Sequence, residues 1–353
     1  MKKVSTPLLL LLVAWPGRAQ LLSRVQLARW PEDRVAAVSL TFDDAMTSQL
    51  DNAVPILRKH DLKATFFVTT GSEAWRKRTP EWKRLAEEGN ELGNHTVNHP
   101  CLLPEITPHS QDFTPESMRS EISDAARDIT KVYPSHRGLT FAYPCGNMSF
   151  GPPQDQVRNA ALYIRFVSEY AFAARGAAGG GAQNPDELSV LNVTDLGSTA
   201  NKDVSQLLAM LQPGVGEHQW SVYCFHGVGG EWLSISSETL DRLAAYLEQH
   251  REIWIATFGD VVRYIQERNA TSVHARESGN SIYVELTWSM DPRSYDLPLT
   301  LRIQLPAGWK TGSASTGTKK IAAKLSGQTR QRTLLVDVPA GTRALHIEGA
   351  VSP

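Results

Sequence analysis

Apolar runs of strand length alternate with amphipathic segments from about residue 36 to residue 269, and this alternation constrains the fold more than any other feature. Strands that alternate with helices predict a parallel sheet with helical crossovers. The alternation repeats more often than a small open sheet allows, which favours a barrel of the (β/α) type. We expect strands at 36–42, 63–68, 91–96, 139–143, 170–175, 220–226 and 253–257, and helices at 47–60, 79–89, 114–132, 154–163, 203–211, 237–250 and 260–269.

Residues 271–353 follow a different pattern, in which apolar and polar side chains alternate with period two. The clearest runs are 281–288, 299–305 and 333–338, and turn residues separate them. This pattern is typical of antiparallel strands, so we predict a small β-sandwich-like accessory domain. Its Trp288 and Trp309 either stack on sugars or pack in the core, which is the more usual position for Trp.

The N-terminus has the features of a secretory signal peptide. A positive start and a short apolar run, 8–15, precede Gly17 and Ala19, small residues that suit a signal peptidase. The run falls short of the ~20 residues that a membrane span needs, and a retained anchor is the alternative. We predict a signal peptide at 1–19, a barrel at 20–270, and a secreted or periplasmic protein with no stable membrane span.

Net charge and cysteine content exclude one class of partner and one class of scaffold. A net charge of -1 over 353 residues gives no electrostatic case for a nucleic-acid partner. Three cysteines are too few for a disulfide-stapled scaffold, although an exported protein can hold one bridge.

Chemically reactive side chains gather at the ends of the expected strands. Asp43 and Asp44 follow the first strand, His95 ends the third, Cys145 follows the fourth and His226 ends the sixth. In (β/α) barrels the active site lies at the carboxyl ends of the strands. Two adjacent carboxylates repel one another unless a counter-charge such as a metal cation lies beside them. A solvated turn is the alternative for this pair.

His95 and His99 have the spacing of a metal-binding pair. The flanking Gly93 and Pro100 favour a turn, in which both imidazoles can face one ion. Two His and one carboxylate, with open positions for water and substrate, form a recurrent catalytic metal site. Two hydrogen-bonded histidines that cap a loop are the alternative. His226 alone would more often be a core histidine, but its place at the same edge favours a functional role.

Five ordered motifs, taken together, carry a family resemblance. They are Thr-Phe-Asp-Asp at 41–44, Ala-Thr-Phe-Phe-Val at 64–68, Asn-His-Thr-x-x-His at 94–99, Phe-Ala-Tyr-Pro-x-Gly at 141–146 and Phe-His at 225–226. With them, residues 36–268 resemble the polysaccharide deacetylases, the NodB-homology group also called carbohydrate esterase family 4. The resemblance implies a distorted (β/α) barrel and a divalent metal, zinc first, with cobalt, nickel or manganese as alternatives. It also implies removal of N-acetyl groups from amino-sugar polymers or, in some members, of O-acetyl groups.

The resemblance implies a role for each matched residue. Asp43 would be the general base and His226 the general acid. The metal ligands would be Asp44, His95 and His99. The backbone N–H of Cys145 would hold the oxyanion, with Tyr143 of the same motif beside the substrate.

This chain departs from the family at two points. Many members carry an Arg, which steadies the base, where Ala142 stands. Arg175, at the end of a later expected strand, could supply that guanidinium beside the substrate; a solvent-facing Arg is the alternative. The Asp-x-x-Asp-Trp motif that orients the catalytic His is absent from the sequence, and Asp195 is the nearest candidate for its role with His226.

Cys101 and Cys145 lie in two loops that should border the same pocket. Because the protein is expected to be exported, we predict a disulfide between them, which requires Cα atoms within about 7 Å. Two buried free thiols are the alternative. Cys224, inside an expected strand, is interpreted as a core residue.

The leading functional prediction is a secreted, metal-dependent deacetylase that releases acetate from N-acetylated amino-sugar polymers or oligomers. An O-acetyl esterase that acts on xylan or a similar glycan is the alternative among enzymes. A catalytically idle carbohydrate-binding protein on the same barrel is the third reading, and the intact set of motif residues disfavours it: Asp43, Asp44, His95, His99 and His226. The expected partner is an acetylated glycan.

Overall fold

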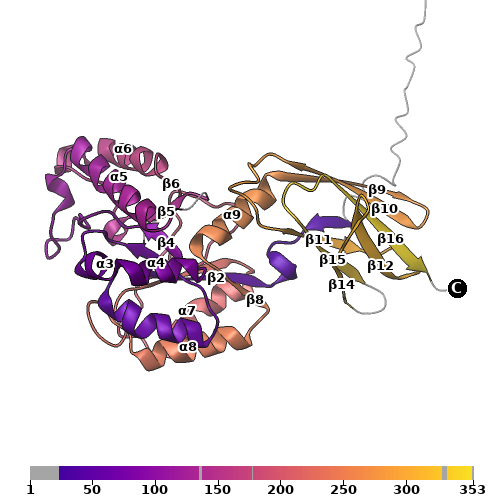
Figure 1. Cartoon of the computed structure of the whole chain (residues 1–353), viewed down its shortest axis with the longest axis horizontal. Coiled ribbons are helices and arrows are strands. Elements are labelled where there is room, and N and C mark those ends of the chain that lie inside the picture. The colour runs from indigo at the N-terminus through magenta and orange to yellow at the C-terminus, as the bar shows by residue number, and fades with distance from the viewer. Residues whose placement is uncertain (1–23, 135–136, 177, 328–331, 352–353) are drawn as a thin grey trace, which may run out of the picture.

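The computed structural model describes residues 24–134, 137–176, 178–327 and 332–351 (Figure 1). The predicted signal peptide, 1–19, lies outside these described residues. Figure 1 shows a part in which helices surround a sheet and a second part built of strands, with α9 (Phe258–Asn269) between them.

A parallel sheet forms the centre of the first part. Its strands pair in the order β6-β5-β4-β3-β2-β7, and β8 pairs with the first half of β2. Every residue of β2 is buried, as expected for a strand that is covered on both faces. Because the pairings are parallel, the carboxyl ends of the strands lie at one edge. The strands are β2 Ala36–Asp43, β3 Thr65–Val68, β4 Glu91–Asn94, β5 Leu139–Ala142, β6 Ala171–Arg175, β7 Trp220–Phe225 and β8 Ile253–Ile255.

An irregular segment closes the sheet between β6 and β7. The Val193 N–H donates to Ala174 O of β6 at 2.9 Å, and the Leu196 N–H donates to Val222 O of β7 at 2.9 Å. The segment thus occupies the place of a strand without forming a regular one. The predicted fold class, a distorted (β/α) barrel, is confirmed.

Helices connect successive strands and cover the outside of the sheet (Figure 1). Besides α9 they are α2 Val54–Lys59, α3 Glu73–Lys77, α4 Thr79–Glu87, α5 Pro115–Val132, α6 Gln156–Ser168, α7 Val204–Gly216 and α8 Ser237–Gln249. The helix expected at 47–60 begins with a π-helical turn, Gln49–Ala53, before α2. Such turns are frequent at functional sites, and Gln49 bonds to the active-site edge, as described below.

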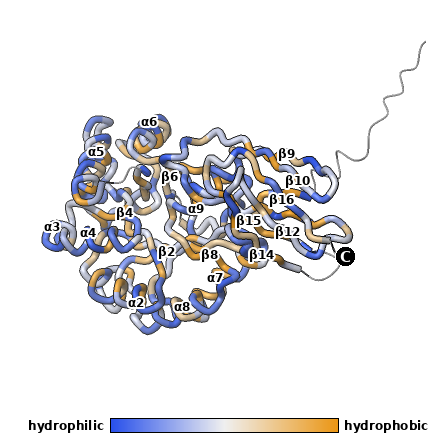
Figure 2. Tube along the Cα trace, turned by 45° about the vertical axis from the view of Figure 1, so that its right-hand side comes forward, coloured by the Kyte–Doolittle hydropathy of each residue, from blue (hydrophilic) through white to orange (hydrophobic). Residues whose placement is uncertain are grey.

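Two antiparallel sheets form the second part and pack their apolar faces together. Their strand orders are β1-β11-β15-β14 and β13-β12-β16-β10-β9. The predicted all-β accessory fold is confirmed, and Figure 2 shows hydrophobic and hydrophilic residues alternating along its strands. The strands are β1 Val25–Leu27, β9 Thr271–Ser278, β10 Ser281–Trp288, β11 Leu299–Gln304, β12 Trp309–Thr316, β13 Lys319–Ile321, β14 Ala323–Ser326, β15 Thr333–Val338 and β16 Ala344–Val351.

The strand β1 joins the start of the described chain to this second part. It pairs antiparallel with β11, where Val25 lies opposite Ile303. The sequence shows no clear period here, because a strand of three residues is too short to show one. The helix α9 ends at Asn269 and β9 begins at Thr271, and the predicted division of the chain at 270 stays a prediction.

The two tryptophans of the sandwich serve packing. Trp309 is buried in its core, and the indole N–H of Trp288 donates to Thr342 O at 2.5 Å. Within the part of the chain that the structure describes, no helix is long and apolar enough to cross a membrane.

Candidate active site

The reactive side chains singled out in the sequence lie at the carboxyl edge of the parallel sheet. Asp43 is the last residue of β2, and Asp44 follows it with a φ of 78°. His95 follows β4 directly, Arg175 ends β6 and His226 follows β7. Parallel pairing brings these residues together although they are far apart in the sequence.

Asp44, His95 and His99 place one ligand atom each around a common point. Asp44 Oδ1 lies 3.5 Å from His95 Nε2 and 3.5 Å from His99 Nε2. All three ligand atoms lie within 4.8 Å of one another. Two ligands of a tetrahedral ion, each ~2.1 Å from it, are about 3.4 Å apart. The spacing and the donor set fit a divalent metal of the zinc type.

Buried polar atoms in the cluster also fit a cation. Asp44 Oδ1 and Asp43 Oδ1 are buried and accept no hydrogen bond from the described residues, a costly state for carboxylate oxygens. His95 Nδ1 donates to Ala142 O at 2.8 Å. Since a carbonyl only accepts, Nδ1 carries a hydrogen, and Nε2, when deprotonated, presents its lone pair to the common point.

The loop that carries both histidines is held by Glu121 of α5. Glu121 Oε2 accepts the backbone N–H groups of Val97 and Asn98 at 3.0 and 2.8 Å, and Oε1 accepts Asn98 Nδ2 at 2.7 Å. Our reasoning from the sequence missed this residue. The available signal was a charged side chain on the apolar face of a helix, beside Met118 and Ile122.

Burial and neighbouring charges favour the metal-binding protonation states of two ligands. Burial alone would raise the pKa of Asp44, but contact with the His95 ring and the charges of His99 and His95 lower it. Burial, followed by the charge of His95, lowers the pKa of His99 to about 4. At neutral pH Asp44 is therefore ionised and His99 neutral, the forms that bind a cation.

The pKa of His95, the third candidate ligand, is shifted in the direction opposite to that of His99. Burial alone would lower the pKa of His95, but the carboxylates of Asp43 and Asp44 outweigh it and raise the pKa. A cation at the common point would replace this proton as the counter-charge of the two carboxylates.

Asp43 is held beside the cluster by Arg175. The guanidinium pairs with Asp43 Oδ2 and donates to Thr41 Oγ1 at 3.0 Å. Burial alone would raise the pKa of Asp43, but the charge of Arg175, followed by those of His95 and His226, lowers it. Asp43 therefore stays ionised in a buried position.

Arg175 reaches Asp43 from the strand next to β5. In the register of β5 and β6, Arg175 lies opposite Ala142, the position at which the motif Arg is missing. Its guanidinium carbon also lies over the Phe67 ring, 5.3 Å from the ring centroid. The structure thus brings to the base a guanidinium that the fourth motif does not provide.

Asp195 lies beside Arg175. Its Oδ2 is 3.9 Å from Arg175 Nε, and its Oδ1 accepts the backbone N–H groups of Gly179 and Gly197 at 3.1 and 2.7 Å. The role suggested for Asp195 as the acid that orients His226 finds no support here, because its carboxylate serves the irregular segment and Arg175.

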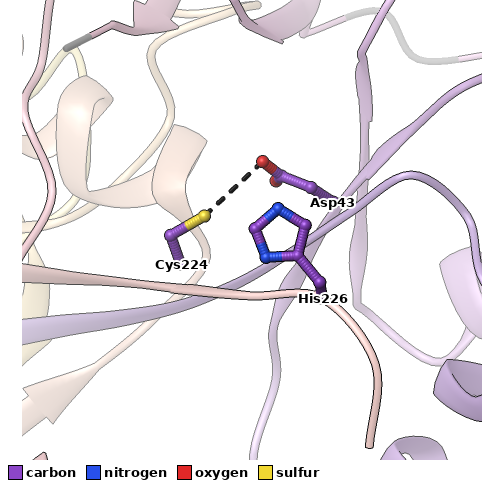
Figure 3. Close-up of side chains that lie close together, drawn as sticks. All are labelled: Asp43, Cys224 and His226. Atoms are coloured by element: carbon purple, nitrogen blue, oxygen red, sulfur yellow. Dashed lines mark hydrogen bonds between the residues drawn. The ribbon is translucent and has the colours of Figure 1, made fainter. Parts of the chain in front are cut away.

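His226 and Cys224 face Asp43 from the end of β7. Figure 3 shows the His226 ring close to the Asp43 carboxylate, and Cys224 Sγ donates to Asp43 Oδ2 at 3.5 Å. Burial raises the pKa of the Cys224 thiol, so it stays protonated. Cys224, interpreted from the sequence as a core residue, thus lines the site. Among the described residues, no side chain hydrogen-bonds the His226 ring.

Gln49, which no motif indicated, ties the ends of two strands together. Its Nε2 donates to Asp43 O at 2.5 Å and to His226 O at 3.1 Å. The π-helical turn at its position therefore places a side chain between the β2 and β7 ends.

The turn after β5 is linked to the histidine loop by a disulfide. Cys101 and Cys145 are bonded, with Cα atoms 6.0 Å apart. Cys145 has a φ of 54°, in the left-handed region, so its backbone N–H is aimed by an uncommon conformation. The bridge fixes this turn relative to the metal-ligand loop.

Tyr143, expected beside the substrate, is fully buried beneath that turn. Its ring packs edge-on against Phe141 and Tyr163, with centroids 5.1 and 5.0 Å away. Burial raises the pKa of its hydroxyl group. The structure therefore places Tyr143 in an aromatic cluster that supports the turn.

Comparisons with known proteins agree with this geometry. Residues 31–162 match the family model described as polysaccharide deacetylase. A gellan lyase of a Bacillus species is 26% identical over 93% of this chain and 13% of its own length. The peptidoglycan-N-acetylglucosamine deacetylase PgdA of Listeria monocytogenes is 38% identical over 20% of this chain and 15% of its own length. The chain thus spans a small part of both relatives.

Among solved structures, a family 4 acetyl xylan esterase from Clostridium thermocellum is 20% identical, with a TM-score of 0.42 over 64% of this chain and 89% of that one. The family match covers β2 to α6 and includes Asp43, Asp44, His95 and His99. Residues 31–162, which run from before β2 into α6, are thus similar to the polysaccharide deacetylase family.

Proposed function

We propose that this protein is a metal-dependent hydrolase that removes acetyl groups from acetylated glycans, with N-acetylated amino-sugar polymers or oligomers as its main substrates. The observation that carries the proposal is the cluster of Asp44, His95 and His99 with the ionised Asp43 beside it. The name of the Listeria relative, a peptidoglycan-N-acetylglucosamine deacetylase, supports an amino-sugar substrate.

Asp43 is suited to act as the general base. Arg175, which also bonds Thr41, pairs with one oxygen and keeps the carboxylate ionised, while Oδ1 has no hydrogen-bond partner among the described residues. That free oxygen can take a proton from the attacking water. A base that is buried and ionised needs no solvent reorganisation at the moment of proton transfer.

His226 is suited to return a proton to the leaving group. It lies across from Asp43 at the end of β7 (Figure 3), and an amine leaves only after protonation. The backbone N–H of Cys145 can stabilise the negative charge that develops on the carbonyl oxygen of the acetyl group. Asp44, His95 and His99 would hold the metal, zinc first with cobalt, nickel or manganese as alternatives, which supplies Lewis-acid activation of the carbonyl and of water when bound.

Export belongs to the same proposal. The predicted signal peptide, 1–19, and the Cys101–Cys145 bridge both suit an oxidising compartment outside the cytoplasm. A secreted or periplasmic protein would meet acetylated cell-wall or extracellular glycans as its partners.

Acetate release tests the proposal. The full-length mature protein, stripped of metal and reloaded with zinc, is incubated with N-acetylglucosamine oligomers, peptidoglycan fragments and acetylxylan. We expect metal-dependent acetate release that is lost in Asp43→Asn, with Asp51→Asn, an exposed Asp on the neighbouring π turn, as the control. No acetate from any substrate at any metal loading would favour the idle carbohydrate-binding protein.

An O-acetyl esterase is the second candidate function. It is favoured by the His226 ring, which lacks a hydrogen-bonded carboxylate among the described residues. An alkoxide is a better leaving group than an amine anion and needs less help from an acid. Faster release from acetylxylan than from amino-sugar oligomers by the same preparation would select this candidate.

A further inference from the structure

The loop that follows the candidate acid His226 presents an aromatic side chain to solvent. Trp232 is 55% exposed and the adjacent Leu233 is 38% exposed. Of the tryptophans that the structure describes, Trp232 is the exposed one, since the others are buried or half-buried. We call residues 227–235 the His226 loop.

Hydrogen bonds from several sides hold the His226 loop in place. The backbone N–H of Ser48 donates to Glu231 Oε2 at 2.6 Å, and Asn52 Nδ2 donates to Val228 O at 2.7 Å. Within the loop, the Gly230 N–H donates to Ser234 Oγ at 2.9 Å. An exposed Trp on such a loop loses little conformational freedom when it binds a ligand.

The backbone on either side of Trp232 is in an unfavourable conformation. Glu231 has a φ of 69° and Leu233 a φ of 46°, both in the left-handed region. For residues other than Gly this region is unfavourable, and it persists where the surrounding structure imposes it. The loop therefore holds an apolar ring in water at a cost in stability, which a role in ligand binding would explain.

Trp232 is attached directly to the catalytic edge. Its carbonyl accepts the N–H of Gly227, the residue after His226, at 3.0 Å. The loop also rests on Ser48 and Asn52, which flank Gln49, and Gln49 bonds both Asp43 O and His226 O. The His226 loop, which carries the exposed ring, thus forms part of the rim of the site.

We propose that Trp232 forms a sugar-binding subsite on this rim, where it stacks on a pyranose ring next to the acetylated sugar in the same glycan chain. A pyranose presents a face of C–H groups, and an aromatic ring with a solvent-exposed face is the side chain that fits it. This inference rests on the proposed function and adds that the enzyme acts on chains in preference to single sugars.

Binding and chain-length dependence test the inference separately from catalysis. Calorimetry uses zinc-loaded Asp43→Asn protein, which cannot consume the ligand, with N-acetylglucosamine oligomers from dimer to hexamer. Trp232→Ala in this background is expected to bind the longer oligomers about tenfold more weakly, while Trp232→Phe keeps most of the affinity. In the active background, Trp232→Ala should raise KM for long oligomers and leave hydrolysis of a small acetyl ester unchanged.

Two further variants separate stacking from general effects. Leu325→Ser removes a side chain with 42% exposure in the sandwich and should change nothing. Glu231→Gln weakens the bond to Ser48 and should reproduce part of the Trp232→Ala effect on long oligomers. Equal oligomer affinity with and without Trp232, or no oligomer binding by Asp43→Asn protein at all, overturns the subsite. If the wild type binds oligomers but releases no acetate, the proposed function is overturned, whereas the sugar-binding role of Trp232 is not.

Discussion

At the scale of single residues, the site depends on how charges are distributed around Asp43. The carboxylate is almost fully buried, and it stays ionised because Arg175 pairs with it and outweighs the effect of burial on its pKa. The sequence motifs contain the proposed base and the candidate metal cluster but not this guanidinium, which comes from another strand.

Removal of the guanidinium gives the first prediction. In Arg175→Met, the pKa of Asp43 should rise, so the acid limb of kcat/KM should move to higher pH and the rate near neutral pH should fall about 100-fold. The limb moves to higher pH because Arg175 lowers the pKa of Asp43 in the native protein. Without Arg175, Asp43 is protonated at pH values where it is ionised in the native protein. A pH–rate profile measures the limb.

A folding defect would not move that limb, so the profile separates the two effects. Loss of one partner from a buried pair should also lower the free energy of unfolding by about 3 kcal/mol. Arg119→Met, which removes an exposed Arg paired with Glu169, is the matched control. An acid limb at the wild-type position in Arg175→Met would contradict the proposed pairing effect.

The second prediction concerns Glu121, which holds the histidine loop through three hydrogen bonds. In Glu121→Gln one carboxylate oxygen becomes a donor, so the backbone N–H groups or the Asn98 amide lose their acceptor. Zinc affinity should fall about 10-fold to 100-fold, the usual effect of removing support behind a metal ligand. Competition with a chromophoric chelator measures the Kd.

Glu116→Gln, an exposed change in the first turn of the same helix, should leave the Kd unchanged. An equal Kd for Glu121→Gln and the wild type would show that the loop holds its shape without the carboxylate.

At the scale of elements, strand ends position the chemistry and loops complete it. The parallel pairing of β2, β4 and β7 brings Asp43, His95 and His226 to one edge. The loops after β4 and β5 then depend on a covalent link, the Cys101–Cys145 bridge, whose cysteines are 44 residues apart.

The third prediction tests that link. Cys101→Ala with Cys145→Ala should lower the free energy of unfolding by about 2–4 kcal/mol, because the bridge restricts the unfolded chain. It should also lower kcat, since the turn that carries the oxyanion N–H is no longer tied to the metal loop. Urea unfolding and acetate release measure the two effects. A double variant with wild-type stability and rate would rule out both roles of the bridge.

The elements also show what could be predicted from the sequence. Long periodic segments such as α5 and buried runs such as β2 were predicted closely, and so were the motif residues at strand ends. Arg175 could be named only as a candidate, because its link to Asp43 depends on the register of two strands. Asp195 was named as a candidate partner of His226, whereas its carboxylate lies 3.9 Å from Arg175 Nε; a long irregular segment carries no period from which its path can be inferred.

At the scale of the whole molecule, α9 connects the barrel to the sandwich. It packs against β9 and β11, and the Tyr264 hydroxyl donates to Ala28 O at 3.2 Å. Glu267 of α9 is fully buried at this junction and accepts the Leu297 N–H at 3.3 Å. Burial, opposed in part by that hydrogen bond, raises the pKa of Glu267 to about 7.

The fourth prediction follows from this raised pKa. Because the native protein holds the Glu267 proton more tightly than the unfolded chain, its contribution to stability is fully present below about pH 4.5 and is lost as the pH rises through about 7. Glu267→Gln removes the titration, so the variant should be more stable than the wild type at pH 8 by about 2–3 kcal/mol.

Urea unfolding at pH 5 and pH 8 measures this difference. Glu277→Gln, an exposed change in β9, should leave the pH dependence of stability as it is in the wild type. The same pH dependence in Glu267→Gln and the wild type would exclude Glu267 as its source.

The pairing of β1 with β11 has a consequence for how the protein is made. Residues 25–27 are synthesised before the barrel, yet their partner strand is synthesised after it. The sandwich can therefore close only after β11 has been synthesised, and until then the first strand has no partner. A truncation that stops after α9 would leave that strand permanently without its partner, so the catalytic half cannot be cut out cleanly at a single point.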